Sequence, residues 1–175
     1  EKKLGPIKSK ITILGYAGTL GISHGLENVI EHFKKLNDKS YILILMGSGA
    51  RFNNLEKMAH ESDNIFVLES VSQDLIEHFY EFIDISLVSL LNIYQYDSVI
   101  PSKIFESVSY SKPVIAAVRG EAKRIIHDNN IGVTFKNDDF IEFSESLKII
   151  RKNIKSNSNY YLKNLIKVKN NYSRE

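Results

Sequence analysis

The stretch Tyr41-Ile42-Leu43-Ile44-Leu45-Met46 is an unbroken run of large apolar residues, and Gly47-Ser48-Gly49 ends it. A strand with one face in water alternates apolar and polar side chains, whereas a strand covered by helices on both faces is apolar throughout. Residues 41–46 are therefore predicted to form a strand inside a parallel sheet that helices cover on both sides.

Strand-like and helix-like segments alternate along the rest of the chain. Short apolar segments predict further strands at 11–14, 65–68, 85–88, 113–117 and 132–135. Apolar residues at helical spacing predict helices at 26–36, 54–62, 75–80, 101–110, 121–128, 139–150 and 159–170. Asn53 is a plausible cap for the second of these helices, and Asp138 or Asp139 for the sixth. The alternation indicates a three-layer α/β/α, Rossmann-like, doubly wound parallel sheet of about six strands.

The composition is that of an ordinary globular protein. Of 175 residues, 43% are hydrophobic and 25% are charged, and a net charge of +2 is too small to indicate nucleic-acid binding. The absence of cysteine excludes disulfides, cysteine zinc sites and thiol catalysis. No apolar run reaches membrane-spanning length, and the first residues lack the apolar segment of a secretory signal. We expect a cytoplasmic protein, and the five histidines show no metal-ligand spacing.

The motifs of several nucleotide-binding and catalytic classes are absent. The glycines of Gly15-Tyr16-Ala17-Gly18-Thr19-Leu20-Gly21 lack the G-x-G-x-x-G spacing, and no acidic residue ends the strand at 41–46, so NAD binding is not expected. The chain has no P-loop, and Gly47-Ser48-Gly49 lacks the flanking pattern of a hydrolase nucleophile.

The fold class itself predicts where a ligand would bind. In a doubly wound sheet, ligands bind beyond the carboxyl ends of the strands, at the point where the winding direction reverses. With the common strand order 3-2-1-4-5, the loops that flank this point are 17–25 and 91–102. We therefore expect the site between these two loops.

The first loop is rich in glycine and leads into a helix. Gly18, Gly21 and Gly25 allow the backbone to approach a ligand closely, and the positive end of the helix dipole faces the same place. These features suit an anion cradle. A tight turn that uses glycine only for its geometry explains them equally well.

The second loop ends in Pro101-Ser102-Lys103-Ile104-Phe105-Glu106, the start of a helix. Ser102 is predicted to cap this helix. Lys103 in the first turn opposes the helix dipole at a cost of a few tenths of a kcal/mol, which a bound phosphate would offset. Glu106, on the same face as Ser102, is either an exposed helix residue or a carboxylate that accepts hydrogen bonds from sugar hydroxyls.

Several motifs together resemble a known family. Tyr16-Ala17-Gly18-Thr19-Leu20-Gly21…His24-Gly25, Gly47-Ser48-Gly49, Pro101-Ser102-Lys103-Ile104-Phe105-Glu106…Ser111-Lys112-Pro113-Val114-Ile115-Ala116 and Gly120-Glu121 occur in family order. They are similar to the C-terminal, donor-binding domain of a GT-B glycosyltransferase of group 1 (family 4), in the branch that builds capsule, O-antigen and other surface polysaccharides. The resemblance covers about residues 10–150.

The resemblance implies roles for individual residues. Glu106 matches the second glutamate of the family's E-x7-E motif, which binds the ribose of the nucleotide. The first glutamate, which contacts the donor sugar in the family, is replaced by Ser98, with Asp97 beside it. Thr19 and His24 stand where the family commonly has basic residues that hold the diphosphate, a charge that Lys103 would supply here. The implied catalytic set is Glu106, Lys103, Asp97 and Ser98, and the implied nucleotide-binding set is Gly18, Thr19, Gly21, His24, Gly47, Ser70, Val71, Pro101, Ser102, Lys103 and Glu106.

The resemblance also divides the chain. It implies a linker at 1–9 from a missing N-terminal domain, a nucleotide-sugar-binding domain at 10–155 and a basic C-terminal helix at 156–175. From residue 147 to residue 174 there are eight Lys or Arg and no acidic residue. This basic segment is a solvated face, a contact with the inner, anionic surface of a membrane, or a helix that returns to the N-terminal domain.

The function implied by the resemblance is that of a retaining glycosyltransferase. It would transfer a sugar from a nucleotide-sugar, most simply a UDP-sugar, to a polysaccharide or lipid-linked acceptor, without a metal. This chain alone would hold the donor without turning it over. The alternatives are a UDP-sugar 2-epimerase of the same fold and a non-catalytic, flavodoxin-like binding domain.

Overall fold

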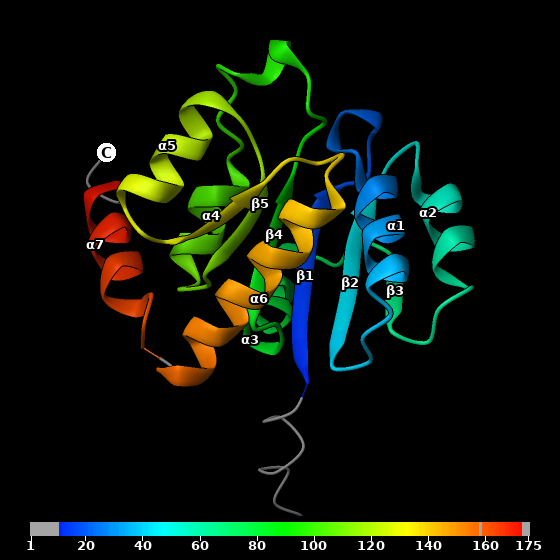
Figure 1. Ribbon diagram of the computed structural model, residues 1–175, viewed down its shortest axis with the longest axis horizontal. Helices are drawn as coiled ribbons and strands as arrows, with labels where there is room; N and C mark the ends of the chain where they lie inside the picture. Colours follow the sequence, from blue (N-terminus) through cyan, green and yellow to red (C-terminus); the bar gives the residue numbers. More distant parts are fainter. Residues whose placement is uncertain (1–10, 158, 173–175) are drawn as a thin grey trace, which may run out of the picture.

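The computed structural model describes residues 11–157 and 159–172 (Figure 1), so the predicted linker at 1–9 lies outside the described residues. Six parallel strands form one sheet in the order β3-β2-β1-β4-β5-β6. This order confirms the predicted doubly wound sheet, with the reversal between β1 and β4. The strands are β1 (Thr12–Thr19), β2 (Tyr41–Ser48), β3 (Ile65–Leu68), β4 (Ile85–Ser89), β5 (Val114–Ala117) and β6 (Gly132–Phe135).

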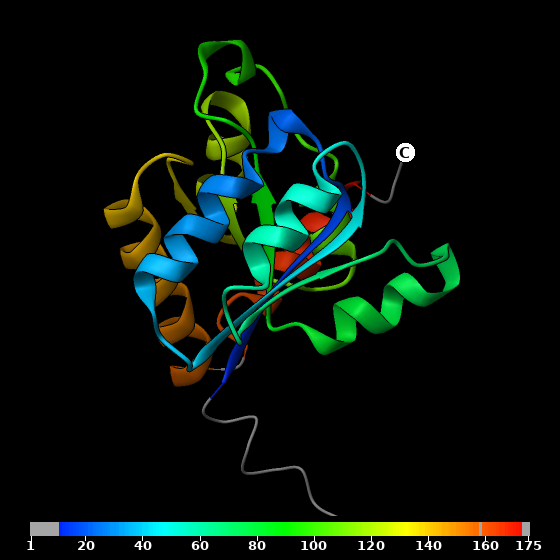
Figure 2. The same cartoon turned by 90° about the vertical axis from the view of Figure 1, so that its right-hand side faces the viewer.

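Helices cover both faces of the sheet, with α1 and α6 on one face and α3 on the other (Figure 2). The α-helices are α1 (Leu26–Leu36), α2 (Phe52–Ala59), α3 (Ile76–Phe82), α4 (Lys103–Ser109), α5 (Gly120–Asp128), α6 (Phe140–Ser156) and α7 (Leu162–Tyr172). Three short 3-10 helices lie in the connections: η1 (Ile22–His24), η2 (Gln73–Leu75) and η3 (Tyr94–Tyr96). No helix within 11–157 or 159–172 has both the length and the apolar character needed to cross a bilayer.

The apolar run that predicted a covered strand is buried as expected. Leu43 and Leu45 of β2 are inaccessible to solvent, and Phe33 of α1 and Phe143 of α6 pack in the same core. The edge strand β3 differs, because Phe66 and Leu68 keep 45% and 46% of their surface exposed. An edge strand has a neighbour on one side only, so its side chains find less cover.

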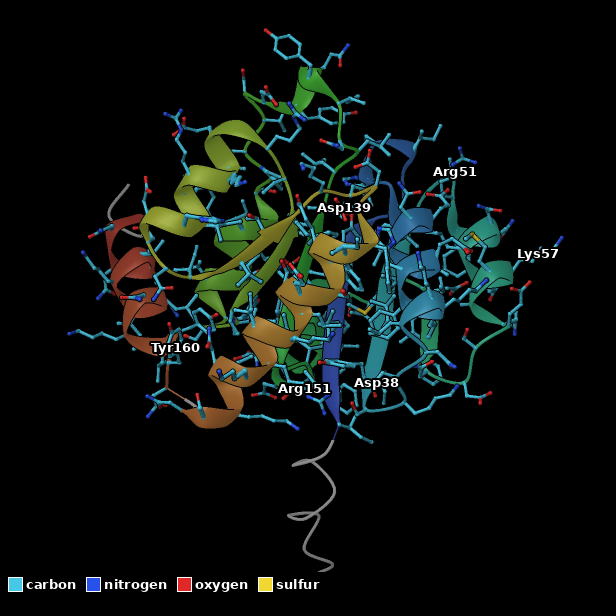
Figure 3. All side chains as sticks on the ribbon, viewed as in Figure 1. Asp38, Arg51, Lys57, Asp139, Arg151 and Tyr160 are labelled. Carbon is cyan, nitrogen blue, oxygen red and sulfur yellow. The ribbon has the colours of Figure 1, made fainter. Side chains whose placement is uncertain are left out.

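The structure corrects one of the predicted helix caps and confirms another. Helix α2 begins at Phe52, with Arg51 rather than Asn53 at the cap position. Asp139 caps α6 by accepting a hydrogen bond from the backbone N–H of Glu142 at 3.0 Å, as predicted, and lies at the end of α6 nearest β6 (Figure 3). Helix α7 packs against α4 with Leu165 and Val168 buried, and Lys163 and Lys167 lie on its exposed face.

Strand β1 is longer than predicted, and its pairing leaves space at the predicted ligand site. It pairs with β2 along its whole length, up to Thr19 with Ser48. It pairs with β4 only at Leu14 and Gly15. Beyond Gly15, β1 and β4 therefore diverge toward their carboxyl ends, and the loops that follow them are free to form a site at the reversal of the sheet.

Candidate functional site

A cavity of about 280 Å³ lies at the carboxyl ends of β1 and β2, and we call it the strand-end cavity. Its walls come from β1, β2, the segment after β3, and α4. Seven of the predicted donor-binding residues line it: Gly18, Thr19, Gly47, Ser70, Val71, Lys103 and Glu106. The structure thus brings together residues up to 88 positions apart, from three of the predicted motifs and from the segment after β3.

Two glycines allow the walls of this cavity to approach each other. A Cβ at Gly47 would collide with the backbone carbonyl oxygen of Gly18 on the neighbouring strand. Gly18 has a φ of +142°, and a Cβ there would collide with the ammonium of Lys103. Glycine is needed at both positions, because any side chain would separate the strand ends or displace the lysine.

The Lys103 ammonium lies inside this cavity, above the backbone of Gly18. It is 5.4 Å from the centre of the Tyr16 ring and makes no ion pair with any carboxylate in the described ranges. Burial lowers the pKa of Lys103, and the nearby charge of Glu106 opposes this shift. A partly buried cation without an ion-pair partner favours binding of an anion.

Ser102 does not cap α4, contrary to the prediction. Its backbone is already helical, with φ −56° and ψ −25°, and its side chain accepts no capping hydrogen bond. Its carbonyl instead accepts the backbone N–H of Glu106 at 3.0 Å. Ser102 thus stands at the cap position, but a capping side chain needs an extended backbone, and the backbone of Ser102 is already helical.

Glu106 is half-buried on the cavity wall, and the side chains behind it are fixed. The buried Tyr80 lies close enough for the charge of the Glu106 carboxylate to act on its hydroxyl, and the Tyr80 ring stacks on Tyr110 with centroids 4.4 Å apart. Burial, with the Glu106 charge, raises the pKa of Tyr80, so this hydroxyl stays protonated. The hydroxyl of Ser107 donates to the Lys103 carbonyl at 2.6 Å and lies 2.6 Å from that of Ser86 on β4. Glu106 therefore faces the crevice from a rigid support.

His24 and Gly21 do not line the strand-end cavity. The His24 Nδ1 lies 3.2 Å from the carbonyl oxygen of Ser89 and donates its proton to it. Burial lowers the pKa of His24, the charge of Lys103 adds to this shift, and the bond to Ser89 opposes it. The imidazole is thus neutral at pH 7, and Lys103 is the cation nearest Gly18.

The lowered pKa of His24 makes the stability of the domain depend on pH. The unfolded state takes up a proton near pH 6.5, whereas the folded state takes it up at lower pH, so this contribution to stability is present above pH 6.5 and is lost below it. We expect His24→Asn to lose less melting temperature than the wild type between pH 7.5 and 5.5. His60→Asn, at an exposed position, is the control and should follow the wild type. Parallel curves for all three proteins would contradict the prediction.

Asp97 and Ser98 line a different cavity, of about 740 Å³, together with residues of α5. We call it the α5 cavity. The Asp97 carboxylate accepts a hydrogen bond from Nε of Arg119 at 2.5 Å, and its carbonyl accepts the backbone N–H of Glu121 at 3.0 Å. Arg119 also donates to the side chain of Asn92 at 2.7 Å. Asp97 thus ties the loop before α4 to the start of α5, and the four predicted catalytic residues are divided between two cavities.

Sequence reasoning missed several residues of the site region. Gln73 of η2 and Ile76 of α3 line the strand-end cavity shortly after the predicted binding residues Ser70 and Val71, and their position after β3 was the available signal. Arg119 follows β5 at the same edge of the sheet. Among residues 11–157 and 159–172, no three His, Asp or Glu side chains are grouped as metal ligands.

The fold and the cavity define a class of protein: a Rossmann-like α/β domain with a ligand crevice where the strand order reverses. Residues 1–164 match the family model described as glycosyl transferases group 1. The chain belongs to this family, and its architecture is that of the C-terminal domain of a GT-B enzyme. A comparison with curated protein sequences gave no significant match.

Solved structures share this fold at low sequence identity. The lipopolysaccharide outer core galactosyltransferase WaaB in its apo form matches with a TM-score of 0.66 and 15% identity, over 97% of this chain and 51% of WaaB. The C-terminal domain of the group 1 glycosyl transferase LpcC from Francisella tularensis matches with 0.67 and 15%, over 94% and 90%. HepE from Anabaena, in complex with UDP and glucose, matches with 0.70 and 13%, over 94% and 44%. The chain thus spans about half of WaaB and of HepE.

Proposed function

We propose that the strand-end cavity binds the nucleotide of a UDP-sugar, and that the complete enzyme transfers the sugar with retention of configuration to a polysaccharide or lipid-linked acceptor. The observation that carries the proposal is the Lys103 ammonium, which is partly buried above Gly18 without an ion-pair partner among the described residues. A diphosphate supplies the missing negative charge at this point. The family and the UDP-bound relative HepE support a nucleotide-sugar as the source of that diphosphate.

The walls of the cavity fit the parts of such a ligand. Lys103 would neutralise the diphosphate and stabilise the charge that develops on it as the bond to the sugar breaks. The carboxylate of Glu106 would accept hydrogen bonds from the ribose hydroxyls. The backbone at Ser70 and Val71 would contact the base, and Gly18 and Gly47 leave room for the phosphates. In this proposal no metal is needed, because Lys103 supplies the positive charge.

The acceptor side lies beyond this chain in the proposal. A GT-B enzyme binds its acceptor mainly through an N-terminal domain, so the chain alone would hold the donor but not turn it over. Asp97 and Ser98 stand at the rim of the α5 cavity, and we propose that they or the neighbouring backbone contact the donor sugar. We further propose that the enzyme is cytoplasmic and takes part in surface-polysaccharide synthesis at the inner face of the membrane. The basic residues of 147–174 would then contact the anionic membrane surface.

Binding of UDP to the purified chain tests the proposal. A ligand at 100 times its dissociation constant stabilises the folded state by about 2.7 kcal/mol, which a thermal melt detects easily. We expect UDP to raise the melting temperature more than ADP or GDP at equal concentration. In an NMR titration, the amide signals of Gly18 and Gly47 should move with UDP, while those of β6 at the far edge should not. Shifts confined to β5 and β6 would refute the site.

A further inference from the structure

The connection between β6 and α6 carries a buried polar residue, Asn137, next to the β1–α1 connection. Figure 1 shows this yellow-to-orange connection running toward the blue segment that precedes α1. Asn137 is 1% exposed, and its side chain makes three hydrogen bonds. Its Nδ2 donates to the carbonyl of Gly25 at 3.0 Å and to the hydroxyl of Ser89 at 2.9 Å. Its Oδ1 accepts from the side chain of Asn28 at 2.7 Å.

A second group of hydrogen bonds continues from Ser89 to the β1–α1 connection. The Ser89 hydroxyl donates to the carbonyl of His24 at 2.6 Å, and the Ser89 carbonyl accepts from the His24 imidazole at 3.2 Å. The backbone N–H of Leu91 donates to the carbonyl of Ser23 at 2.9 Å. Residues 23–25 are therefore hydrogen-bonded to the end of β4, and Asn137 bonds both to Gly25 on one side and to Ser89 on the other.

These hydrogen bonds connect the two chain segments where β1 and β4 no longer pair. β1 and β4 pair only at Leu14 and Gly15, so no strand pairing fixes the β1–α1 connection against β4. Gly25 has a left-handed φ of +56°, and a Cβ there would lie 2.6 Å from the Asn137 Oδ1. Glycine at 25 and asparagine at 137 thus fit each other, and a fully satisfied buried network of this kind fixes one geometry.

We propose that Asn137 is a positioning residue for the donor site: it fixes residues 23–25 against β4, and thereby sets the position of the β1–α1 connection relative to Lys103. The inference rests on the proposed function for its ligand. Within this segment the His24 ring packs edge-on against the Tyr16 ring with centroids 6.0 Å apart, and the Lys103 ammonium lies 5.4 Å from the centre of the same Tyr16 ring. A shift of residues 23–25 would therefore displace the aromatic ring beside the cation that faces the diphosphate. The base and ribose are held by other elements and depend less on Asn137.

The test uses Asn137→Ala, with Asn64→Ala as a matched control. Asn64 is half-buried at the opposite edge of the sheet, where its Nδ2 donates to the carbonyl of Tyr41 at 2.9 Å. Titration calorimetry is performed with UDP and with uridine for wild type and both variants. We expect both variants to lower the melting temperature. Only Asn137→Ala should weaken UDP binding, by about 5- to 10-fold, with uridine affinity changed less than about 2-fold.

A second measurement does not depend on UDP. In Asn137→Ala the imidazole of His24 loses its fixed surroundings, so its NMR-measured pKa should rise toward 6.5, while Asn64→Ala should leave it unchanged. If Asn137→Ala does not fold, Asn28→Ala is used instead. Asn28 is half-buried, and its side chain donates one hydrogen bond to the Asn137 amide. This variant should weaken UDP binding and raise the pKa of His24, as expected for Asn137→Ala.

The possible failures can be distinguished. A wild type that does not bind UDP refutes the proposed function and, with it, the ligand in this inference. A wild type that binds UDP, with an Asn137→Ala or Asn28→Ala variant that binds it equally well and keeps the wild-type His24 pKa, refutes the positioning role alone. Equal losses for UDP and uridine would also overturn it, because they would place the effect outside the diphosphate.

Discussion

A Lys103→Ala variant is expected to bind UDP about 5- to 150-fold more weakly than the wild type, a loss of about 1–3 kcal/mol. The ammonium lies in the strand-end cavity without an ion-pair partner among the described residues, so its attraction to a diphosphate is not already used by a carboxylate. Titration calorimetry with UDP measures the loss. The melting temperature without ligand should stay the same or rise, since a partly buried cation is removed.

Uridine and a second lysine serve as controls for this experiment. Uridine lacks the diphosphate, so its affinity should change far less in Lys103→Ala. Lys57 lies on the exposed face of α2 and projects away from the sheet (Figure 3), so Lys57→Ala should bind both ligands as the wild type does. Equal losses for UDP and uridine in Lys103→Ala would mean that Lys103 acts through the shape of the site.

The sheet could be predicted from local patterns because each strand carries its own signal. The unbroken apolar run of β2 and the four apolar residues of β3 reflect burial along a few consecutive residues. The extension of β1 to Thr19 was missed, since the glycines Gly15 and Gly18 are poor strand formers. These residues are strand because β2 pairs with them along its whole length, and no short window of sequence contains that partner.

The site was predictable where its residues cluster in short motifs. Gly18 lies in one of the two predicted loops, Lys103 and Glu106 lie in the helix that directly follows the other, and all three line one cavity. Asn137 is different, because its bonds to Gly25 and Asn28 span 112 and 109 residues. An asparagine before a helix looks like an ordinary turn residue, so only the folded arrangement distinguishes it.

Asp97 illustrates the limit of reading a motif by spacing. Its place beside the first position of the E-x7-E pattern makes it a candidate for contact with the sugar, yet its carboxylate is bonded to Arg119. The turn before α5 adds to this contact: Gly120 has a φ of +49°, and a Cβ there would collide with the Asp97 carbonyl. Asp97 therefore holds two loops together, and any contact with a sugar has to share its carboxylate with Arg119.

Glu106→Gln is expected to weaken UDP binding by about 1–3 kcal/mol. A carboxylate can accept hydrogen bonds from both ribose hydroxyls, whereas the amide keeps one acceptor oxygen and loses the charge. The free energy of unfolding should change by no more than about 0.5 kcal/mol, because Glu106 lies on a cavity wall and not in the core. Calorimetry with UDP and thermal melting without ligand measure the two quantities on the same samples.

Discrimination between UDP and 2′-deoxy-UDP separates a ribose contact from a general electrostatic effect. If Glu106 binds the ribose, the wild type prefers UDP, and Glu106→Gln loses much of that preference, since the missing 2′-hydroxyl removes one of the two bonds that the carboxylate makes. Glu77→Gln, at an exposed position on α3, removes the same charge from a neighbouring helix and should keep the full preference. A Glu106→Gln variant that discriminates as well as the wild type would remove Glu106 from the ribose site. In the described structure the carboxylate would then act through its charge on its neighbours Lys103 and Tyr80 and not on the ribose.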